Sequence, residues 1–302
     1  MLELYAMIEY RSLNSYLKER FGCKVYKLAL DGGFTCPNRD GTVGSGGCIF
    51  CLSGSSDFAV PCRGNVAEAI ETARLLVSNK KGSKFIAYFQ SYTGTYDTVE
   101  NLRKLYLEAA RCDDIVAISI GTRPDCLPDE VISLLKEINA IKPVWIELGL
   151  QTIHEQTAKY IRRGYSLQVF DDAVKRLKAA GIEIIVHMII GLPGETDELT
   201  WQTAEYIGRS GADGIKFQLL HVLRGTDLAD DYEQRKFEVL SMDEYFRILA
   251  GCLERIPKTM VVHRLTGDGA KRDLIAPLWS AAKKKVMNEF KKYLEQEKSP
   301  AQ

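Results

Sequence analysis

Three cysteines lie within 16 residues of one another, in the segment GGFTCPNRDGTVGSGGCIFC. Cys36, Cys48 and Cys51 have the spacing C-x11-C-x2-C. Cysteine thiolates are the usual ligands of iron-sulfur clusters, and a [4Fe-4S] cube held by only three of them keeps one iron open to another ligand. Four glycines between the first two cysteines would let the loop turn back until the three sulfurs face one point. The spacing therefore predicts a cluster whose open iron could start catalysis.

A structural zinc ion is the alternative use of these thiolates. Structural zinc sites take four protein ligands, and no histidine occurs in the first 153 residues. The fourth ligand would therefore come from a distant residue or from another cysteine. The remaining cysteines are scattered, which is typical of small buried or surface residues and predicts no second cluster: Cys23, Cys62, Cys112, Cys126 and Cys252.

Length and composition bound the kind of protein that must carry this loop. The chain has 302 residues, of which 46% are apolar, enough for one large α/β domain or two small ones. Lys+Arg and Asp+Glu balance at 40 each, so any contact with a nucleic acid must be a local patch. No apolar run approaches the length of a membrane span and no signal peptide is evident, which predicts a soluble, cytoplasmic protein without a membrane partner.

Short β-rich runs alternate with helical patterns along most of the chain. Six strands are predicted at 25–30, 84–89, 115–120, 144–150, 183–190 and 214–220. Helices are predicted at 66–77, 99–110, 128–138, 167–180 and 196–208. Repeated βα units indicate a parallel sheet that is closed, or nearly closed, as a barrel. Such barrels carry their chemistry at the carboxyl ends of the strands, which is where the cysteine loop follows the first strand.

The pattern changes after the sixth strand. A seventh strand is predicted at 260–265, a turn at 266–273 and a terminal helix at 277–297. Apolar residues recur every fourth place in that helix, at Leu278, Ala282, Val286, Phe290 and Leu294. The lysines fall away from this stripe and form either a solvated face or a local RNA contact: Lys283, Lys284, Lys285, Lys291 and Lys292. We therefore divide the chain into a helical extension (1–24), a barrel (25–222) and a C-terminal extension (223–302).

A family resemblance rests on the cysteine loop together with ELGLQT (147–152), RRGY (162–165) and GLPGET (191–196). These segments resemble the radical S-adenosylmethionine (SAM) superfamily over residues 16–268. The long C-x11-C-x2-C spacing is that of its YhcC-like branch, whereas the general superfamily motif is shorter. The resemblance implies an α/β fold with a partial (β/α)6 barrel of the TIM type and extensions at both ends.

The same resemblance implies two cofactors. Cys36, Cys48 and Cys51 would hold a [4Fe-4S] cluster whose open iron chelates the amino and carboxylate groups of SAM. An electron donor such as flavodoxin or ferredoxin would reduce the cluster. SAM would then be cleaved to methionine and a 5'-deoxyadenosyl radical that abstracts hydrogen from a substrate carbon. The cofactor carries this chemistry, and the protein contributes positioning and exclusion of water.

SAM-binding residues are implied near the ends of the first three strands. Phe50 matches an aromatic near the adenine, although a hydrophobic plug is the alternative. The segment QSYTG would grip the SAM amino group in place of the family's glycine-glycine-glutamate form, with the residues Gln90, Ser91, Tyr92, Thr93 and Gly94. GTRPD (121–125) is similar to ETRPD in the elongator catalytic subunit, with Gly121 in place of the acid and Thr122 beside it.

Further SAM-binding residues are implied on the fourth and fifth strands. Glu147 and Gln151 belong to ELGLQT, and Gln151 matches the residue that reaches the SAM ribose. Arg163 matches the arginine that pairs with the SAM carboxylate, although Arg162 could serve and an exposed ion pair is the alternative. His187 is either a satisfied core residue or a site residue.

The turn after the fifth strand would lie along the adenine through Gly191, Leu192 and Pro193. Helix capping alone would explain Glu195 and Thr196, which follow. Candidates to face a substrate lie after the sixth strand and in the seventh, namely His221, Arg224, His263 and Arg264.

The function predicted from these residues is that of a radical SAM enzyme. Analogy with relatives of this type favours modification of a tRNA nucleoside, specifically the side chain of a wobble uridine, with tRNA as partner. The alternative reaction is radical oxidation or rearrangement of a small metabolite. The basic terminal helix would supply the phosphate contact if tRNA is the substrate.

Overall fold

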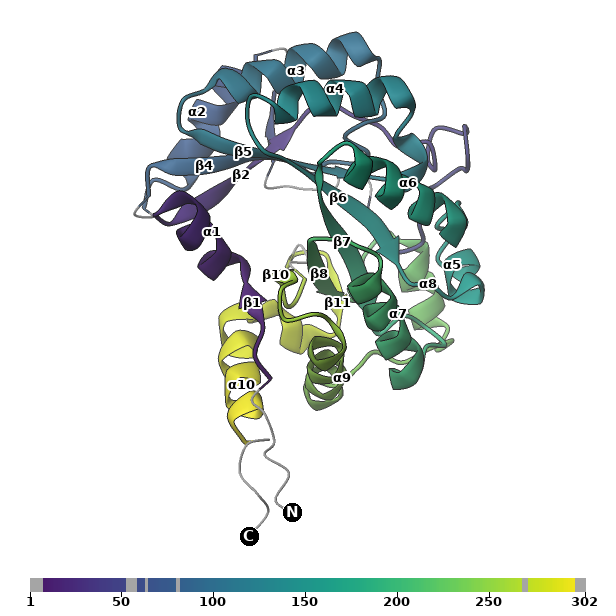
Figure 1. Cartoon of the computed structure of the whole chain (residues 1–302). Coiled ribbons are helices and arrows are strands. Elements are labelled where there is room, and N and C mark those ends of the chain that lie inside the picture. Colours follow the sequence, from purple (N-terminus) through teal and green to yellow (C-terminus); the bar gives the residue numbers. More distant parts are fainter. Residues whose placement is uncertain (1–7, 53–58, 63–64, 80–81, 268–270, 297–302) are drawn as a thin grey trace.

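A single curled sheet of parallel strands organises the protein (Figure 1). The computed structural model describes residues 8–52, 59–62, 65–79, 82–267 and 271–296. Helices cover the outer face of the curl. Across the sheet the strands are β1 (Arg11–Ser12), β10 (Val261–Arg264), β8 (Gly214–Leu219), β7 (Glu183–Ile190), β6 (Val144–Gln151), β5 (Ile115–Thr122), β4 (Lys84–Phe89), β2 (Val25–Asp31) and β3 (Val60–Pro61).

The six predicted strands are confirmed as β2 and β4 to β8, which form the core of a half-barrel. The predicted seventh strand is β10, and it pairs in parallel with β8 from Val261 opposite Gly214. β1 then pairs in parallel with β10. Residues beyond 222 and before 25 therefore extend the barrel sheet itself, and the β-branched Val261 and Val262 of β10 are buried there.

All five predicted barrel helices form, as α2 (Val66–Leu76), α3 (Val99–Arg111), α4 (Asp129–Asn139), α6 (Leu167–Ala179) and α7 (Asp197–Arg209). The sequence analysis missed α5 (Glu155–Tyr160), α8 (Asp227–Glu233), α9 (Met242–Arg255) and the 3-10 turn η1 (Pro124–Cys126). The signal for α9 was present in the sequence, since Ser241 and Glu244 form a capping box at its start.

The helix α1 (Leu13–Phe21) closes the amino-terminal end of the barrel. The Tyr16 hydroxyl donates to Glu183 Oε2 at 2.8 Å, and Lys84 Nζ donates to the carbonyl of Phe21 at 3.1 Å. Glu183 and Lys84 are the first residues of their strands, so α1 lies across these strand ends. Leu17 packs there on a layer of apolar side chains inside the barrel, which we call the apolar floor: Val25, Ile86, Ala117, Trp145 and Ile185.

The predicted terminal helix is divided into the 3-10 turn η2 (Leu278–Ala281) and α10 (Lys283–Gln296). Val286 and Phe290 are buried, and the Phe290 ring lies 5.2 Å from that of Phe246 in α9. The predicted stripe is wrong at Leu278, which is 71% exposed, and at exposed Ala282, because a 3-10 turn does not keep the α-helical period. Residue 297 of the predicted helix and residues 268–270 of the predicted turn lie outside the described residues.

A short antiparallel pair follows the barrel, formed by β9 (Val222–Leu223) and β11 (Leu274–Ala276). It ties the segment before α10 to the carboxyl end of β8. In the described part of the chain, the helices are all too short or too polar to cross a membrane.

Candidate functional site

The cysteine loop leaves the carboxyl end of β2 and is anchored at the mouth of the barrel. The Asn38 side chain donates to the carbonyl of Arg162 at 2.6 Å, and Ile49 N donates to the carbonyl of Ile161 at 3.2 Å. Leu228 N in α8 donates to the Ile49 carbonyl at 3.0 Å. The loop is therefore fixed from both sides by segments that follow β6 and β8.

The three cysteines of the loop share one neighbourhood. All three are free and partly exposed. Burial, together with the nearby Cys51 and Cys36, raises the pKa of the Cys48 thiol to about 11, although the Arg123 guanidinium and the Asn38 side chain oppose the rise. Asn38 Nδ2 lies 3.5 Å from Cys48 Sγ. Among the described residues, no three Cys, His, Asp or Glu side chains converge on a single metal ion. A structural zinc site takes four protein ligands, whereas a cube with one open iron takes three thiolates, which is the set that this loop offers.

Two arginines flank the thiols. The Arg39 guanidinium donates to the carbonyl of Cys51 and lies 5.7 Å from the centre of the Tyr92 ring. Arg123 is buried and pairs with Asp125 at 2.7 Å. Positive charge of this kind stabilises thiolates and the anionic clusters they hold.

The QSYTG segment follows β4 and packs against the cysteine loop. Thr93 N donates to the carbonyl of Thr35 at 3.2 Å, and Gly94 N donates to the carbonyl of Gly121 at 2.8 Å. Ser91 and Thr93 are buried, and Gln90 and Tyr92 are partly exposed. A Cβ atom on Gly94 would lie 2.7 Å from Ile120, so the close approach to β5 requires glycine. The predicted motif is thus adjacent to the cysteines.

The GTRPD and RRGY segments brace each other at the ends of β5 and β6. Arg123 donates to the carbonyl of Arg163 at 2.9 Å and lies 4.9 Å from the Tyr165 ring centre. The buried Thr122 hydroxyl is 2.5 Å from that of Thr95. Thr122 therefore lies buried at the carboxyl end of β5, and its contact with SAM stays a prediction.

Arg163 has a different environment from the predicted one. Its side chain is almost fully buried, and the guanidinium donates to the carbonyls of Thr152 at 2.6 Å and Tyr165 at 3.0 Å. These contacts hold the turn after β6, so the geometry does not support the predicted SAM carboxylate contact. Arg162 has a φ of 54° and pairs on the surface with Asp227.

Glycine and buried apolar groups form the turn after β7. Gly191 has a φ of 90°, and a Cβ atom there would lie 3.0 Å from Leu240. Leu192 is buried and Pro193 is partly exposed. The Thr152 hydroxyl donates to Glu195 beside Gln151, whose φ is 70°. The ends of β6 and β7 are therefore joined at the mouth.

Thr196 is the N-cap of α7, as capping alone would explain. Phe50 packs at the edge of the apolar cluster that includes Ile161 and Leu228. That contact agrees with the alternative role of Phe50 as a hydrophobic plug. A contact of Phe50 with the adenine stays a prediction.

Glu147 and His187 lie deeper, inside the barrel, and not at the mouth. His187 Nε2 is 2.7 Å from Glu147 Oε2. Lys27, Tyr88, Ser119 and Lys216 also contact the Glu147 carboxylate, at distances from 2.5 to 3.1 Å. We call these six residues, drawn from six strands, the polar layer.

The pKa values of three groups in the polar layer are lowered. The lowered pKa keeps Glu147 charged, whereas it favours the neutral forms of His187 and Lys216. Burial by itself would raise the pKa of Glu147, but Lys216, Lys27 and His187 hold it well below its usual value. Burial lowers the pKa of His187 to about 4, despite its bond to Glu147. Burial also lowers the pKa of Lys216 to about 7, opposed by Glu147 and aided by Arg264 and Lys27.

Comparison with known proteins identifies the family. The radical SAM superfamily model matches residues 38–207, and the radical SAM C-terminal domain model matches residues 212–296. The chain belongs to the radical SAM superfamily. Members use a [4Fe-4S] cluster and SAM, and this chain is accordingly a radical SAM enzyme.

Two bacterial relatives align with nearly the whole chain. The uncharacterized protein YtqA of Bacillus subtilis is 45% identical, over 95% of this chain and 89% of its own length. Protein YhcC of Escherichia coli is 37% identical, over 92% of this chain and 90% of its own length. These matches confirm the YhcC-like branch.

More distant similarity extends to archaeal proteins. A tRNA uridine(34) acetyltransferase of Methanocaldococcus infernus is 26% identical, over 51% of this chain and 29% of its own length. The solved structure of Methanocaldococcus infernus Elp3 with its N-terminus deleted superposes with a TM-score of 0.67 at 18% identity, covering 90% of this chain and 63% of that one. The latter similarity establishes the half-barrel fold.

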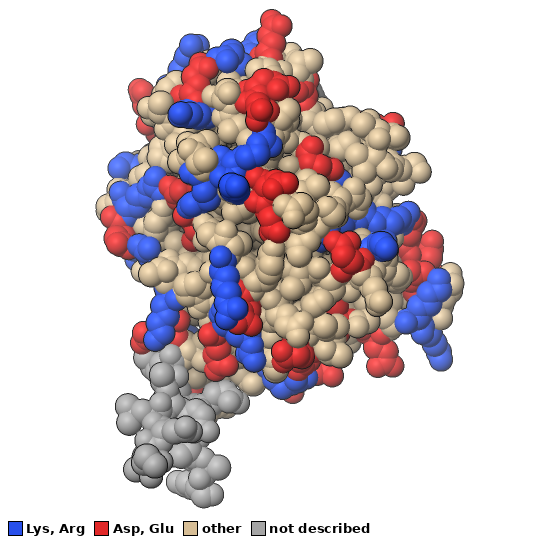
Figure 2. Space-filling view, turned by 45° about the vertical axis from the view of Figure 1, so that its right-hand side comes forward, with Lys and Arg blue, Asp and Glu red and all other residues tan. Residues whose placement is uncertain are grey.

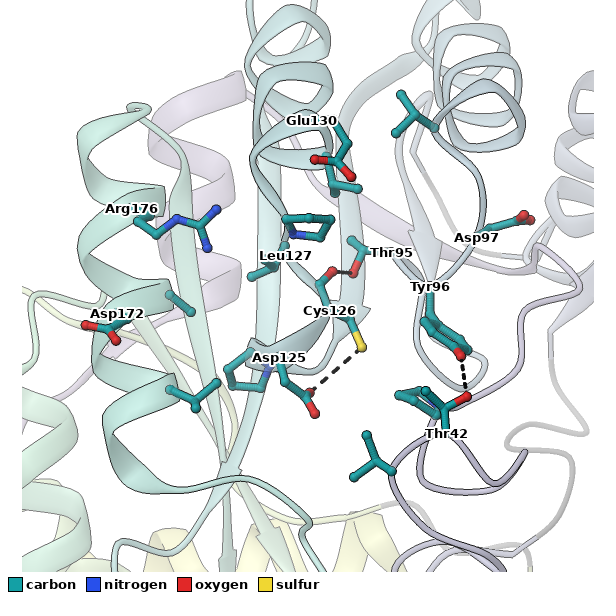
Figure 3. A pocket seen from close by; sticks show the side chains of 18 of the residues that line it. Thr42, Thr95, Tyr96, Asp97, Asp125, Cys126, Leu127, Glu130, Asp172 and Arg176 are labelled. Atoms are coloured by element: carbon teal, nitrogen blue, oxygen red, sulfur yellow. Dashed lines mark hydrogen bonds between the residues drawn. The ribbon is translucent and has the colours of Figure 1, made fainter.

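The radical SAM barrel also carries a groove outside its mouth, of about 980 Å³. Figure 3 shows its lining, in which the Thr42 and Tyr96 hydroxyls of two loops meet at 2.9 Å and Cys126 faces the opening near Asp125. Asp172 and Arg176 of α6 form the other wall. This groove lies beside the cysteine loop and is separate from the polar layer.

The predicted substrate-facing residues are dispersed in this radical SAM fold. Arg264 donates to Gln218 at 2.6 Å from neighbouring strands. The His263 ring lies edge-on to Trp145 at 5.6 Å, close to the amino-terminal floor. Arg224 is exposed, whereas His221 is buried. They do not form one cluster.

Sequence reasoning missed Lys27, Tyr88, Ser119 and Lys216 in this enzyme. The available signal was a polar residue at an inward position of an otherwise apolar strand, such as Lys216 in GIKFQLL. Period-two alternation alone cannot tell the inside of a barrel from its helix-covered face.

Proposed function

We propose that this radical SAM enzyme modifies a nucleoside of tRNA, at the side chain of a wobble uridine. The observation that carries the proposal is the alignment with a tRNA uridine(34) acetyltransferase over 51% of the chain. That protein's name concerns uridine 34, the wobble position. Resemblance of GTRPD to the elongator motif adds support from the end of β5.

Within this proposal, Cys36, Cys48 and Cys51 hold the cluster, and SAM binds beside it. When bound and reduced, the cluster and SAM supply a 5'-deoxyadenosyl radical. The residues that we assign to SAM lie at the strand ends around the cysteine loop: Phe50, Gln90, Ser91, Tyr92, Thr93, Gly94, Thr122, Gln151, Gly191, Leu192 and Pro193. We assign Arg163 to positioning the turn after β6. Glu147 and His187 belong to the polar layer, which we place beneath the cofactors.

The chain's own contribution is orientation and exclusion of water. α1 and the apolar floor pack across the amino-terminal end of the barrel. A substrate covering the mouth would then separate reactive carbon centres from bulk water. Flavodoxin or ferredoxin is the class of electron donor that we propose.

Surface charge limits how tRNA would bind. Basic and acidic side chains are intermixed over the face shown in Figure 2. Net charge is zero, so phosphate contacts must be local. The first turn of α10 is the patch that we assign, because three consecutive exposed lysines begin there.

The proposal is tested by comparing nucleosides of tRNA from cells with and without this protein, by mass spectrometry. We expect one modified uridine to disappear, or its precursor to accumulate, in the strain that lacks the protein. An inactive triple variant of the cluster cysteines should give the same profile as the deletion. Identical profiles in all strains would contradict the proposal and favour a small-metabolite substrate.

A further inference from the structure

The polar layer is unusual for the interior of a parallel barrel. Barrel interiors are normally packed with branched apolar side chains. Here an apolar floor is followed by a level in which Lys27, Glu147, His187 and Lys216 meet. Removing charges from water costs several kcal/mol per ion unless they are paired and hydrogen-bonded. Such a concentration beneath a cofactor site is typical of a catalytic role.

The layer is reachable from inside the barrel. Lys27 and His187 each keep 21% of their side-chain surface accessible, whereas Glu147 has none exposed. Lys216 keeps 7%, so it is less accessible than Lys27 and His187 and more accessible than Glu147.

Lys216 is the most tightly held of these bases. Its Nζ donates to Glu147 Oε2 at 2.6 Å and to the Tyr88 hydroxyl at 2.7 Å. An ammonium has three N–H donors, so one remains for another acceptor. Two contacts fix the position of the amine, so the remaining donor has a defined direction in which it could reach a bound molecule.

Burial, aided by neighbouring cations, favours release of the Lys216 proton. Lys27 from β2 and Arg264 from β10 add positive charge, and Glu147 from β6 is the single anion. His187 from β7 and His263 from β10 are neutral, because burial lowers the pKa of each. Tyr88 from β4 stays protonated, because burial raises its pKa well above the usual value. Burial is the main cause of the lowered pKa of Lys216, Glu147 offsets it only in part, and the neighbouring cations lower it further. Lys216 can therefore exist as either ammonium or amine near neutral pH.

We propose that Lys216 is an acid-base catalytic residue that exchanges a proton with the substrate, and that Glu147 and Tyr88 are its positioning residues. In the forward step the Nζ–H bond breaks, and the proton bonds to a substrate atom that contributes an electron pair. The electron pair of the broken bond stays on Nζ. The neutral amine regains its proton from solvent at the mouth. That the substrate is a tRNA nucleoside rests on the proposed function.

The titration of Lys216 is measured without any substrate, by nitrogen-15 NMR of lysine Nζ groups in the full chain. The Lys216 signal is assigned by its absence from Lys216→Arg. We expect it to titrate near neutral pH, several pH units below the surface lysines, and to move lower still in Glu147→Gln. Titration together with the surface lysines would overturn the proposal, even if tRNA proves to be the substrate.

Turnover of tRNA provides the second measurement. Arginine cannot be deprotonated in proteins, so Lys216→Arg keeps the charge and loses proton exchange. We expect Lys216→Arg and Lys216→Met to convert tRNA from the deletion strain at least about 100-fold more slowly than the parent. Lys175→Met, on the exposed face of α6, is the matched control. Iron content and circular dichroism establish that each variant is loaded and folded.

The outcomes are distinguishable. Parent-like conversion by Lys216→Arg overturns the acid-base role and leaves the proposed function intact. If the parent itself converts no tRNA, the proposed function fails and the NMR titration decides the role of Lys216.

Discussion

The three loop cysteines differ from the other cysteines chiefly in their neighbours, since two of the others are also partly exposed. Cys62, Cys126 and Cys252 are buried, whereas Cys36, Cys48 and Cys51 are partly exposed beside two arginines. A thiol must be both reachable and stabilised as a thiolate to bind iron. Residue-scale environment therefore separates ligands from structural cysteines of the same type.

We expect Cys36→Ala, Cys48→Ala and Cys51→Ala each to abolish cluster binding and SAM cleavage. A cube that lacks one of three thiolates has no protein ligand to replace it. Iron content after anaerobic reconstitution and 5'-deoxyadenosine formation are the measurements. Cys112→Ala, at a partly exposed cysteine on α3's C-cap, should retain both. A Cys48 variant with about four irons and full SAM cleavage would contradict the assignment.

Arg163→Ala should destabilise the fold by about 3 kcal/mol, because the buried carbonyls of Thr152 and Tyr165 lose a charged donor. Arg162→Ala is the matched control next in sequence. Its exposed ion pair with Asp227 is worth at most about 1 kcal/mol. Urea denaturation measures both free energies of unfolding. Equal stabilities with weaker SAM binding in Arg163→Ala would instead restore the predicted carboxylate contact.

Lys216 makes a pH-dependent contribution to stability with a definite sign. Its folded-state pKa of about 7 lies below the ordinary value of 10.5, so the unfolded chain binds more protons between these values. The free energy of unfolding contributed by Lys216 therefore rises with pH across that window. We expect the stability difference between the parent and Lys216→Met to shift in the parent's favour from about pH 7.5 to about pH 9.5, which lies inside this window. A difference that does not change with pH would contradict the lowered pKa.

At the scale of elements, α10 carries lysines both in its first turn and in its second half. Lys292 lies 3.0 Å from Glu289, and Lys291 lies 4.0 Å from Glu295, so both have carboxylates on their own helix. Lys283, Lys284 and Lys285 occupy the first turn. Just before that turn, Trp279 donates to the carbonyl of Leu240, which packs over Gly191 at the mouth. The first turn therefore follows a segment that is held near the mouth, and it is the part of α10 that we propose to contact tRNA.

Changing Lys283, Lys284 and Lys285 together to Gln should weaken tRNA binding and flatten its salt dependence. Each lost phosphate contact reduces the slope of log K against log salt by about 0.7 to 0.9. Binding measured at several salt concentrations gives the slope directly. The matched variant Lys291→Gln with Lys292→Gln should change it less. An unchanged slope in the triple variant would make this turn an ordinary solvated face.

At the scale of the whole molecule, the barrel depends on segments from both ends of the chain. β10 covers the edge of β8, β1 covers β10, and Leu17 of α1 packs on the interior floor. The predicted division at 25 and 222 therefore cuts through one packed unit. An uncovered parallel edge and an open floor would expose apolar surface to water.

We expect the fragment 25–222 to fail to fold as a cooperative unit. The full chain should show a single urea transition by circular dichroism, whereas the fragment should aggregate or unfold without a clear midpoint. The fragment retains Trp145, buried inside the barrel, and Trp201 in α7, so tryptophan fluorescence of a fragment carrying Trp201→Phe reports the barrel interior. A sharp transition in the fragment would support the predicted domain boundaries.

The sequence by itself determined the features that depend on local spacing. Alternating βα patterns predicted the six central strands and their five helices, because strand and helix periods are local properties. The cysteine spacing and the motifs at 147–152, 162–165 and 191–196 predicted the family and its cofactors. These segments lie close together along the chain or follow strands whose carboxyl ends must share one edge.

Only the tertiary structure decided what meets across the barrel. Glu147 contacts Lys27, which is 120 residues away, and Lys216, which is 69 residues away, and neither pairing leaves a local trace in the sequence. Arg163 was predicted to contact the SAM carboxylate. Its guanidinium instead donates to the backbone carbonyls of Thr152 and Tyr165 in the turn after β6. The closing of the sheet by β10 and β1 likewise depends on pairing between distant strands. Such contacts arise because burial selects partners by shape and charge in three dimensions, which a one-dimensional period does not encode.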